Sequence, residues 1–249
     1  MFGELLLSRR NLGLTGDGVA DTASTEVSPL RLIYGARKLD RVVSGADDLL
    51  REWREKERDF SQLYLEYKPV TPRDQVVLED LAVTMLVNSR VEARQAMGFF
   101  RNCASLDLSG LPEKPLGATS ESERAEVASL IGVMTSWPGV GASVATKTLH
   151  KKRPELIPML DNMAIFGAYM NPRWPEQRAK EDTVKAVARI KEALDWIAVD
   201  VTREENEEAW RQLEGLDRER TRIELFDMVW WMFFSPRRAG ITGTAARGN

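Results

Sequence analysis

Residues 137–147 read Trp-Pro-Gly-Val-Gly-Ala-Ser-Val-Ala-Thr-Lys, which predicts a tight turn between two helices. One helix is expected over residues 120–136, and the next begins at Ala142. The glycines on either side of Val140 permit left-handed backbone angles and leave the first amides of the second helix facing outward. Since the helix dipole favours negative charge at that end, the turn suits an anion such as a phosphodiester. The same pattern also fits a plain corner between two helices.

Positive charge is concentrated directly after this turn. Residues 137–160 contain four Lys or Arg and one acid, whereas the whole chain of 249 residues has a net charge of −3. This overall acidity argues against a protein that coats nucleic acid non-specifically, because such binding needs many cationic contacts to phosphate. A localised contact stays open, as does a solvated helix end, where cations are favoured anyway. The residues expected to contact nucleic acid here are Gly139, Val140, Gly141, Ser143, Lys147, His150, Lys151 and Lys152.

The composition excludes several other kinds of site. With Cys103 as its only cysteine, the chain has no internal disulfide framework and no thiolate metal cluster. With His150 as its only histidine, it has no multi-histidine metal site. No apolar run approaches the roughly 18 residues of a membrane helix. We therefore expect no metal site, no cofactor other than a monovalent cation at the turn, no membrane association and a cytoplasmic location.

Helical periodicity dominates the remainder of the chain, and no alternating strand pattern stands out. The sequence Thr71-Pro72-Arg73-Asp74 predicts the start of a helix that runs to about Val87. Further helices are expected over residues 46–64, 91–101, 176–199 and 204–234, the last with a break near Gly215. The predicted fold class is all-α, a two-lobed helical bundle with a helix-hairpin-helix element.

Three regions follow from this pattern. Residues 1–30 are predicted to form a partly flexible N-terminal arm, and residues 235–249 a flexible tail. Between them, residues 31–234 form a single helical domain of two lobes, with the hairpin at residues 124–152. One lobe combines the first and last helices, the other surrounds the hairpin, and a cleft is expected between them.

Two aspartates are candidates for chemistry. Asp161 follows the extended apolar piece 156–160 and begins the next predicted helix. It is either a helix cap or a carboxylate at the mouth of a cleft, and the two interpretations are compatible because capping fixes its orientation. Asp227 lies in the apolar run 225–231. We expect it to pair with an arginine, and a catalytic role is the minority interpretation.

The order of hairpin, helix, short apolar piece and Asp resembles the helix-hairpin-helix superfamily of DNA glycosylases. The separation between Gly141 and Asp161 along the chain is also similar to that of the superfamily. The resemblance implies that Gly139–Gly141 grips the backbone of duplex DNA and that Asp161 is catalytic toward a flipped base. Ala142 and Ser143 stand where lyase members carry a lysine, so the implied activity is a monofunctional glycosylase.

The same resemblance assigns a role to a second loop. Asn88 follows the predicted helix over residues 74–87 and is similar in place to the loop that pushes a side chain into the duplex. Trp174, in a loop of its own, is a candidate for stacking on a base. Residues 145–158 also resemble a bacterial family of uncharacterised proteins. Three functions stay open: base excision, a non-catalytic nucleic-acid-binding helix-hairpin-helix module, and a helical scaffold protein.

Overall fold

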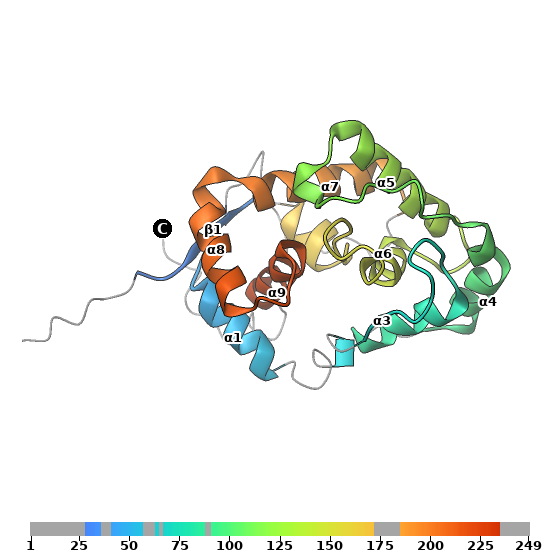
Figure 1. Ribbon diagram of the computed structural model, residues 1–249, viewed down its shortest axis with the longest axis horizontal. Helices are drawn as coiled ribbons and strands as arrows, with labels where there is room; N and C mark the ends of the chain where they lie inside the picture. Colours follow the sequence, from blue (N-terminus) through green and yellow to red (C-terminus); the bar gives the residue numbers. More distant parts are fainter. Residues whose placement is uncertain are drawn as a thin grey trace, which may run out of the picture.

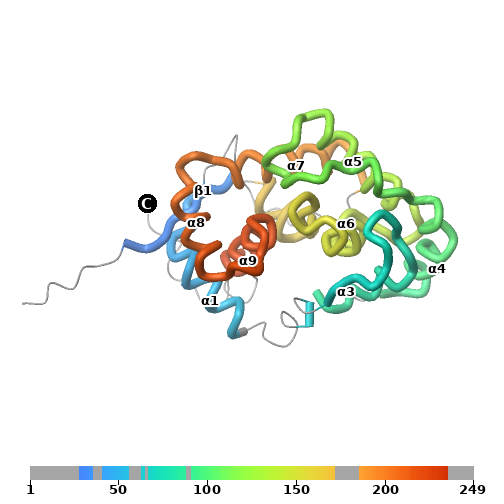
Figure 2. The backbone as a smooth tube through the Cα atoms, in the orientation of Figure 1, coloured from blue at the N-terminus to red at the C-terminus, as the bar shows by residue number. Residues whose placement is uncertain are grey.

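The computed structural model describes residues 28–35, 41–56, 63–64, 67–87, 91–171 and 185–234. The described chain is predominantly helical, which confirms the coarse prediction. Its helices are arranged in two lobes, and the beginning and end of the described chain share one of them (Figure 1). The tube in Figure 2 shows the middle of the chain forming the other lobe. In the described ranges, no helix is long and apolar enough to cross a bilayer.

The first lobe contains the two strands, which the sequence did not predict. β1 (Arg31–Tyr34) and β2 (Arg41–Ser44) pair antiparallel, and Leu32 lies opposite Val43. Both of these side chains are fully buried. The prediction of a purely helical chain is therefore wrong, because strands of four residues are too short to establish a clear alternation.

Helices from both ends of the sequence complete the first lobe. α1 (Ala46–Lys56) packs against α8 (Glu207–Leu216) and α9 (Arg222–Phe234). The short η5 (Glu204–Asn206) connects α7 (Val187–Thr202) to α8. The predicted break between the last helices is confirmed, although α8 continues past Gly215 to Leu216.

The second lobe surrounds α6. Its elements are η1 (Leu78–Ala82), α3 (Val83–Leu86), α4 (Ala93–Asn102), η2 (Cys103–Ser105), η3 (Leu116–Ala118), α5 (Glu121–Thr135) and α6 (Ala142–His150). α6 contacts η1, α3 and α5, and α7 packs along α5. Ser120 caps α5, since its hydroxyl accepts the Glu123 N–H at 3.3 Å and its own N–H donates to the Glu123 carboxylate at 2.7 Å. The predicted start of this helix is confirmed.

The predicted helix start at Thr71 is wrong, because regular structure begins only at Leu78. The side chain of Asp80, rather than Thr71, accepts the backbone N–H at this start, from Val77 at 2.9 Å. Thr71 instead donates its hydroxyl to Asp80 at 2.8 Å. Local capping chemistry was overridden by a contact with a residue further along the chain.

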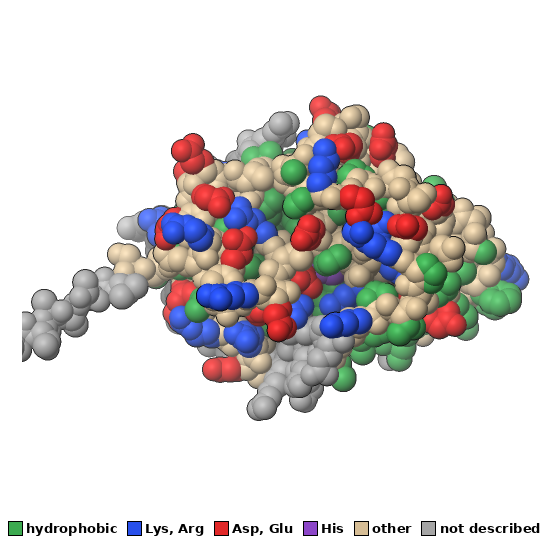
Figure 3. Space-filling view, in the orientation of Figure 1, with side chains coloured by type: hydrophobic (Ala, Val, Ile, Leu, Met, Phe, Trp, Pro, Cys, Tyr) green, Lys and Arg blue, Asp and Glu red, His purple; other side chains and the backbone are tan. Residues whose placement is uncertain are grey.

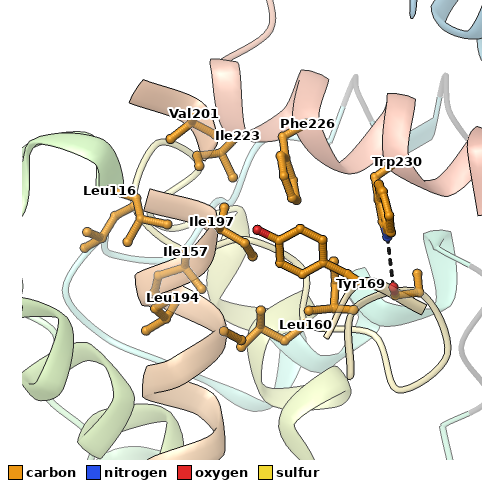
Figure 4. Packing of buried hydrophobic residues seen from close by; sticks show 14 of the residues in the cluster. Leu116, Ile157, Leu160, Tyr169, Leu194, Ile197, Val201, Ile223, Phe226 and Trp230 are labelled. Carbon is orange, nitrogen blue, oxygen red and sulfur yellow. Dashed lines mark hydrogen bonds between the residues drawn. The ribbon is translucent and has the colours of Figure 1, made fainter. Parts of the chain in front are cut away.

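Aromatic packing joins η4 (Ala164–Tyr169) to the first lobe. Tyr169 lies against Phe226 and Trp230 of α9, with ring centroids 5.6 and 5.2 Å away (Figure 4). The indole N–H of Trp230 donates to the carbonyl of Ala164 at 2.8 Å. This packing fixes the segment that follows Asp161.

Candidate nucleic-acid interface

The α5–α6 turn (residues 136–141) has the backbone geometry that its glycines predict. Gly139 has a φ of +77°, in the left-handed region that side chains disfavour. The Val140 N–H donates to the carbonyl of Trp137 at 3.1 Å, and its side chain is fully buried. α5 ends at Thr135 and α6 begins at Ala142, so the predicted boundaries are confirmed.

The first amides of α6 have no side-chain cap. Gly141 is the N-cap residue, and the first backbone bond runs from the Ala145 N–H to its carbonyl at 2.9 Å. The amides of residues 142–144 therefore precede the hydrogen-bond ladder of the helix. Ala142 is fully buried, whereas Ser143 is only half-buried. Ser143 is thus the position where this positive helix end approaches the surface.

Helix α4 packs directly on this turn. The side-chain amide of Gln95 donates to the Gly139 carbonyl at 3.1 Å. A Cβ on Gly98 would lie 2.9 Å from the Pro138 carbonyl oxygen, so only glycine permits this approach. A Cβ on Gly139 would lie 3.4 Å from Cγ of Arg94. Arg94 is exposed and forms no ion pair with the described residues. Its side chain therefore places a positive charge beside the turn.

The sequence did not single out Arg94 as a site residue. It lies far before the turn along the chain, and its own helix carries no motif that indicates binding. The sequence signal for the position of Arg94 would have been Gly98, because a glycine in a helix permits another backbone, here that of Pro138, to pack closely against it. That signal is too weak to recognise in a single sequence.

Two of the predicted phosphate contacts are wrong, because His150 and Lys152 are buried. The ring Nδ1 of His150 lies 2.6 Å from the Ile157 carbonyl oxygen. The ammonium group of Lys152 contacts the hydroxyl of Thr71 and lies 3.1 Å from the Asp80 carboxylate. Both side chains therefore join parts of the protein to one another instead of facing a ligand.

The other basic residues of this segment also have partners within the chain. Arg153 is buried and pairs with Asp74. Lys151 lies 4.0 Å from the ring centroid of Tyr64, and burial lowers its pKa. Lys147 is half-buried, and its ammonium group donates to the Val87 carbonyl at 3.4 Å. The positive stretch in the sequence is therefore mostly a set of internal contacts.

Asp161 caps the helix that follows it, as the simpler interpretation predicted. Its Oδ1 accepts the N–H groups of Met163 at 2.7 Å and Ala164 at 2.9 Å. Its Oδ2 accepts no hydrogen bond from the part of the chain that the structure describes. η4 is a π-helix, a rare form that occurs often at functional sites.

Asp161 follows a residue that is hydrogen-bonded to α6. The preceding Leu160 N–H donates to the Thr146 hydroxyl of α6 at 2.9 Å. Burial lowers the pKa of Lys147, and the negative charge of Asp161 opposes this shift. Asp161 is only partly buried, so a carboxylate oxygen with no hydrogen-bond partner among the described residues lies near the cation of Lys147 on α6.

Asp227 is a second carboxylate near Asp161. Its Oδ2 accepts the Met159 N–H at 2.9 Å, which holds the extended piece before Asp161. Burial raises the pKa of Asp227 to about 7, and the charges of Glu224 and Asp161 add to this effect. The prediction of an arginine partner is wrong for the described chain, since Arg220 pairs with Glu224 and Arg222 with Glu207 and Glu214.

Glu224 has the opposite electrostatic behaviour. Burial alone would raise its pKa, but His150, the Thr221 N–H and Arg220 outweigh burial and hold that pKa at about 2. The hydroxyl of Tyr64 and the Nε2 of His150 have no hydrogen-bond partner in the described part of the chain. Ionised Glu224 thus balances the cations around it, whereas Asp227 can hold a proton near neutral pH.

Three predictions remain without a structural test. Asn88 and Trp174 lie outside the described residues.

Across the described residues, no three His, Cys, Asp or Glu side chains are placed to hold a metal. The carbonyls of Trp137 and Gly139 already accept hydrogen bonds, so a monovalent cation at the turn would have to share them.

Comparisons with known proteins identify a family but no activity. No curated protein and no solved structure has a significant match to the chain. The profile of a family of unknown function, DUF6308, matches residues 46–234, which include both lobes and the turn. The chain is therefore a member of the DUF6308 family.

Proposed function

We propose that this protein binds duplex DNA through a helix-hairpin-helix contact at the α5–α6 turn and hydrolyses the N-glycosidic bond of a displaced base. The proposal is supported most directly by Asp161, whose Oδ1 is used for capping while Oδ2 has no partner among the described residues. The neighbouring Leu160 is hydrogen-bonded to α6, the helix that the turn begins. The hydrogen bond from Leu160 to Thr146 thus connects the segment that carries Asp161 to the helix whose first amides have no side-chain cap.

The binding step uses the helix end and Arg94. A phosphate beside Ser143 would accept hydrogen bonds from the first backbone amides of α6, and the helix dipole would stabilise its negative charge. The exposed Arg94 would add a charge that the buried Lys152 cannot supply. Because the chain is acidic overall, binding is expected to be weak and to decrease steeply with salt.

The chemical step uses the carboxylate. A base must leave the duplex before its bond to the sugar can be reached. As the C1′–N bond breaks, its electron pair leaves with the base and the sugar becomes positively charged. Asp161 would stabilise that charge, and water would then add to C1′ and lose a proton, which neutralises the departed base. No cofactor takes part in this reaction.

The binding test substitutes Ser143→Glu, which places a negative charge beside the expected phosphate. Acidic residues stabilise the first turn of a helix, so folding should be preserved. Ser122→Glu is a matched control at the equivalent position of α5. We expect the Ser143 variant to lose most duplex binding in fluorescence anisotropy at low salt and the Ser122 variant to keep it. Equal binding by the two variants would remove the turn from the interface.

The activity test compares wild type with Asp161→Asn on duplexes that each carry one damaged or modified base. Asn also caps helices, so the variant should fold and bind DNA normally. Base release should decrease on the order of 100-fold or more if the carboxylate stabilises the sugar cation. Release that survives the substitution undiminished would remove Asp161 from the mechanism.

A non-catalytic nucleic-acid-binding module is the second candidate. It is favoured by the cap itself, because the two bonds to Met163 and Ala164 are a sufficient structural reason for an aspartate here. This function predicts salt-sensitive binding that Ser143→Glu abolishes, with no base release from any duplex. The two experiments above therefore distinguish the candidates.

A further inference from the structure

Helix α4 presents an apolar surface beside the α5–α6 turn. Phe100 is 68% exposed and Met97 is 46% exposed, while the adjacent Phe99 is fully buried. Hydrophobic side chains reach the surface over α4 at the right edge of Figure 3, next to a basic side chain. Single exposed apolar side chains are common, but neighbouring exposed apolar side chains that form a patch can mark a contact with a partner.

Two arginines border this surface. Arg94 and Arg101 are both exposed, and neither forms an ion pair within the described ranges. Arg94, Met97 and Arg101 follow the spacing that places residues on one side of a helix, and Phe100 is one turn after Met97. We name Arg94, Met97, Phe100 and Arg101 the α4 face.

The position of the α4 face connects it with the turn. Gly98 packs against the Pro138 carbonyl, and the side chain of Arg94 lies beside Gly139. The arginines therefore lie along the side of α4 that borders the turn, while Phe100 lies further away. A strand that places phosphates at the turn and on the arginines would bring its bases over Met97 and Phe100.

We propose that the α4 face binds an unpaired stretch of nucleic acid, with bases stacked on Phe100 and phosphates beside Arg94 and Arg101. The proposal rests on the turn being a nucleic-acid contact. Charge favours this occupant, because two arginines that form no ion pair with the described residues border the apolar side chains of an acidic protein. Stacking on an aromatic ring requires bases that are not already stacked in a duplex.

The experiment measures the anisotropy of a fluorescein-labelled single-stranded oligonucleotide and of the matching duplex at low salt. Phe100→Ala should weaken single-strand binding about tenfold and leave duplex binding nearly unchanged. Val199→Ala, at an exposed apolar position on α7, is the control for truncation and should change neither. Arg101→Gln should weaken single-strand binding, whereas Arg218→Gln, at an exposed arginine after α8, should not.

Two outcomes would overturn the proposal. One is single-strand binding by Phe100→Ala at wild-type strength. The other is a wild-type dimer in analytical ultracentrifugation that Phe100→Ala converts to a monomer, because a second copy would then cover the face. Ser143→Glu separates this inference from the proposed function. If it has no effect while Phe100→Ala does, the contact at the turn fails and single strands bind the α4 face without a path from the turn. The reverse result removes only the α4 face.

Discussion

The ammonium group of Lys152 lies 3.1 Å from the carboxylate of Asp80, and each side chain is 1% exposed. This pair fastens the chain after α6 to η1, which comes much earlier in the sequence. The same lysine also donates to the Pro72 carbonyl at 3.0 Å. A residue that looks like a surface cation in the sequence is therefore part of the internal framework of the second lobe.

Removing this cation is expected to destabilise the fold. Lys152→Met leaves the Asp80 carboxylate buried without its partner, which should cost about 3–5 kcal/mol of unfolding free energy. Lys114→Met is a suitable control, because Lys114 pairs with Glu123 at the surface and such pairs contribute at most about 1 kcal/mol. Urea denaturation measures both. Similar losses in the two variants would show that the buried pair has no special role.

Gly98 should tolerate alanine poorly, even though alanine usually stabilises a helix. A Cβ there would lie 2.9 Å from the Pro138 carbonyl oxygen, so α4 or the turn must move. We expect Gly98→Ala to lose about 1–3 kcal/mol in thermal or urea unfolding. Gly215→Ala on α8 has no atom within 4 Å of the new Cβ and should gain up to about 1 kcal/mol. A gain in both variants would contradict the close packing of α4 on the turn.

The capping role of Asp161 can be separated from its chemical role. Asp161→Ala removes the acceptor for the Met163 and Ala164 amides and should cost about 1 kcal/mol of stability. Asp161→Asn should have nearly the same free energy of unfolding as wild type, because its side-chain amide oxygen can accept the same two hydrogen bonds. Chemical denaturation of the three proteins checks this order. Equal losses in both variants would mean that the charge, and not the cap, stabilises the native state.

The buried carboxyl of Asp227 predicts that stability decreases with rising pH. Burial raises its pKa from 3.8 to about 7, so the folded state binds this proton more tightly than the unfolded state. The stabilising contribution is full below pH 3.8 and is lost as the pH rises through 7. A shift of this size corresponds to about 4 kcal/mol. The charged and titratable groups around Asp227 are His150, Glu224, Asp161, Tyr64 and Tyr34.

Asp227→Asn isolates this effect, because the surrounding groups titrate in both proteins. The amide oxygen can still accept the Met159 N–H, but it has no charge to bury. The stability of the variant relative to wild type should increase as the pH rises from 3.8 to about 7 and then level off, as measured by urea unfolding at each pH. A constant difference over that range would show that Asp227 does not titrate there.

Local patterns in the sequence predicted the elements whose chemistry is local. The α5–α6 turn and the Ser120 cap depend on residues a few positions apart, and both have the predicted boundaries. Thr71 failed as a helix start because its partners, Asp80 and Lys152, come from further along the chain. The same reason explains Lys152, since its burial depends on a distant acid. Sequence periodicity contains no information about such partners.

The candidate site was predicted in part. Asp161 was correctly expected to begin a helix, and Ser143 lies at the half-exposed start of α6. Arg94 and Asp227 reach the site from helices far away in the sequence, so only the tertiary structure shows that they are close to it. Long-range packing therefore determines which charges surround the turn and Asp161.

The aromatic contacts of Tyr34 determine when the protein can finish folding during its synthesis. Tyr34 packs against Trp210, Phe226 and Trp230, which are among the last of the described residues to be translated. The lobe around α6 is synthesised in between, and domains generally fold as their residues emerge from the ribosome. The ring of Tyr34 therefore lacks these three aromatic partners until α8 and α9 have been synthesised, so the first lobe completes its core only then.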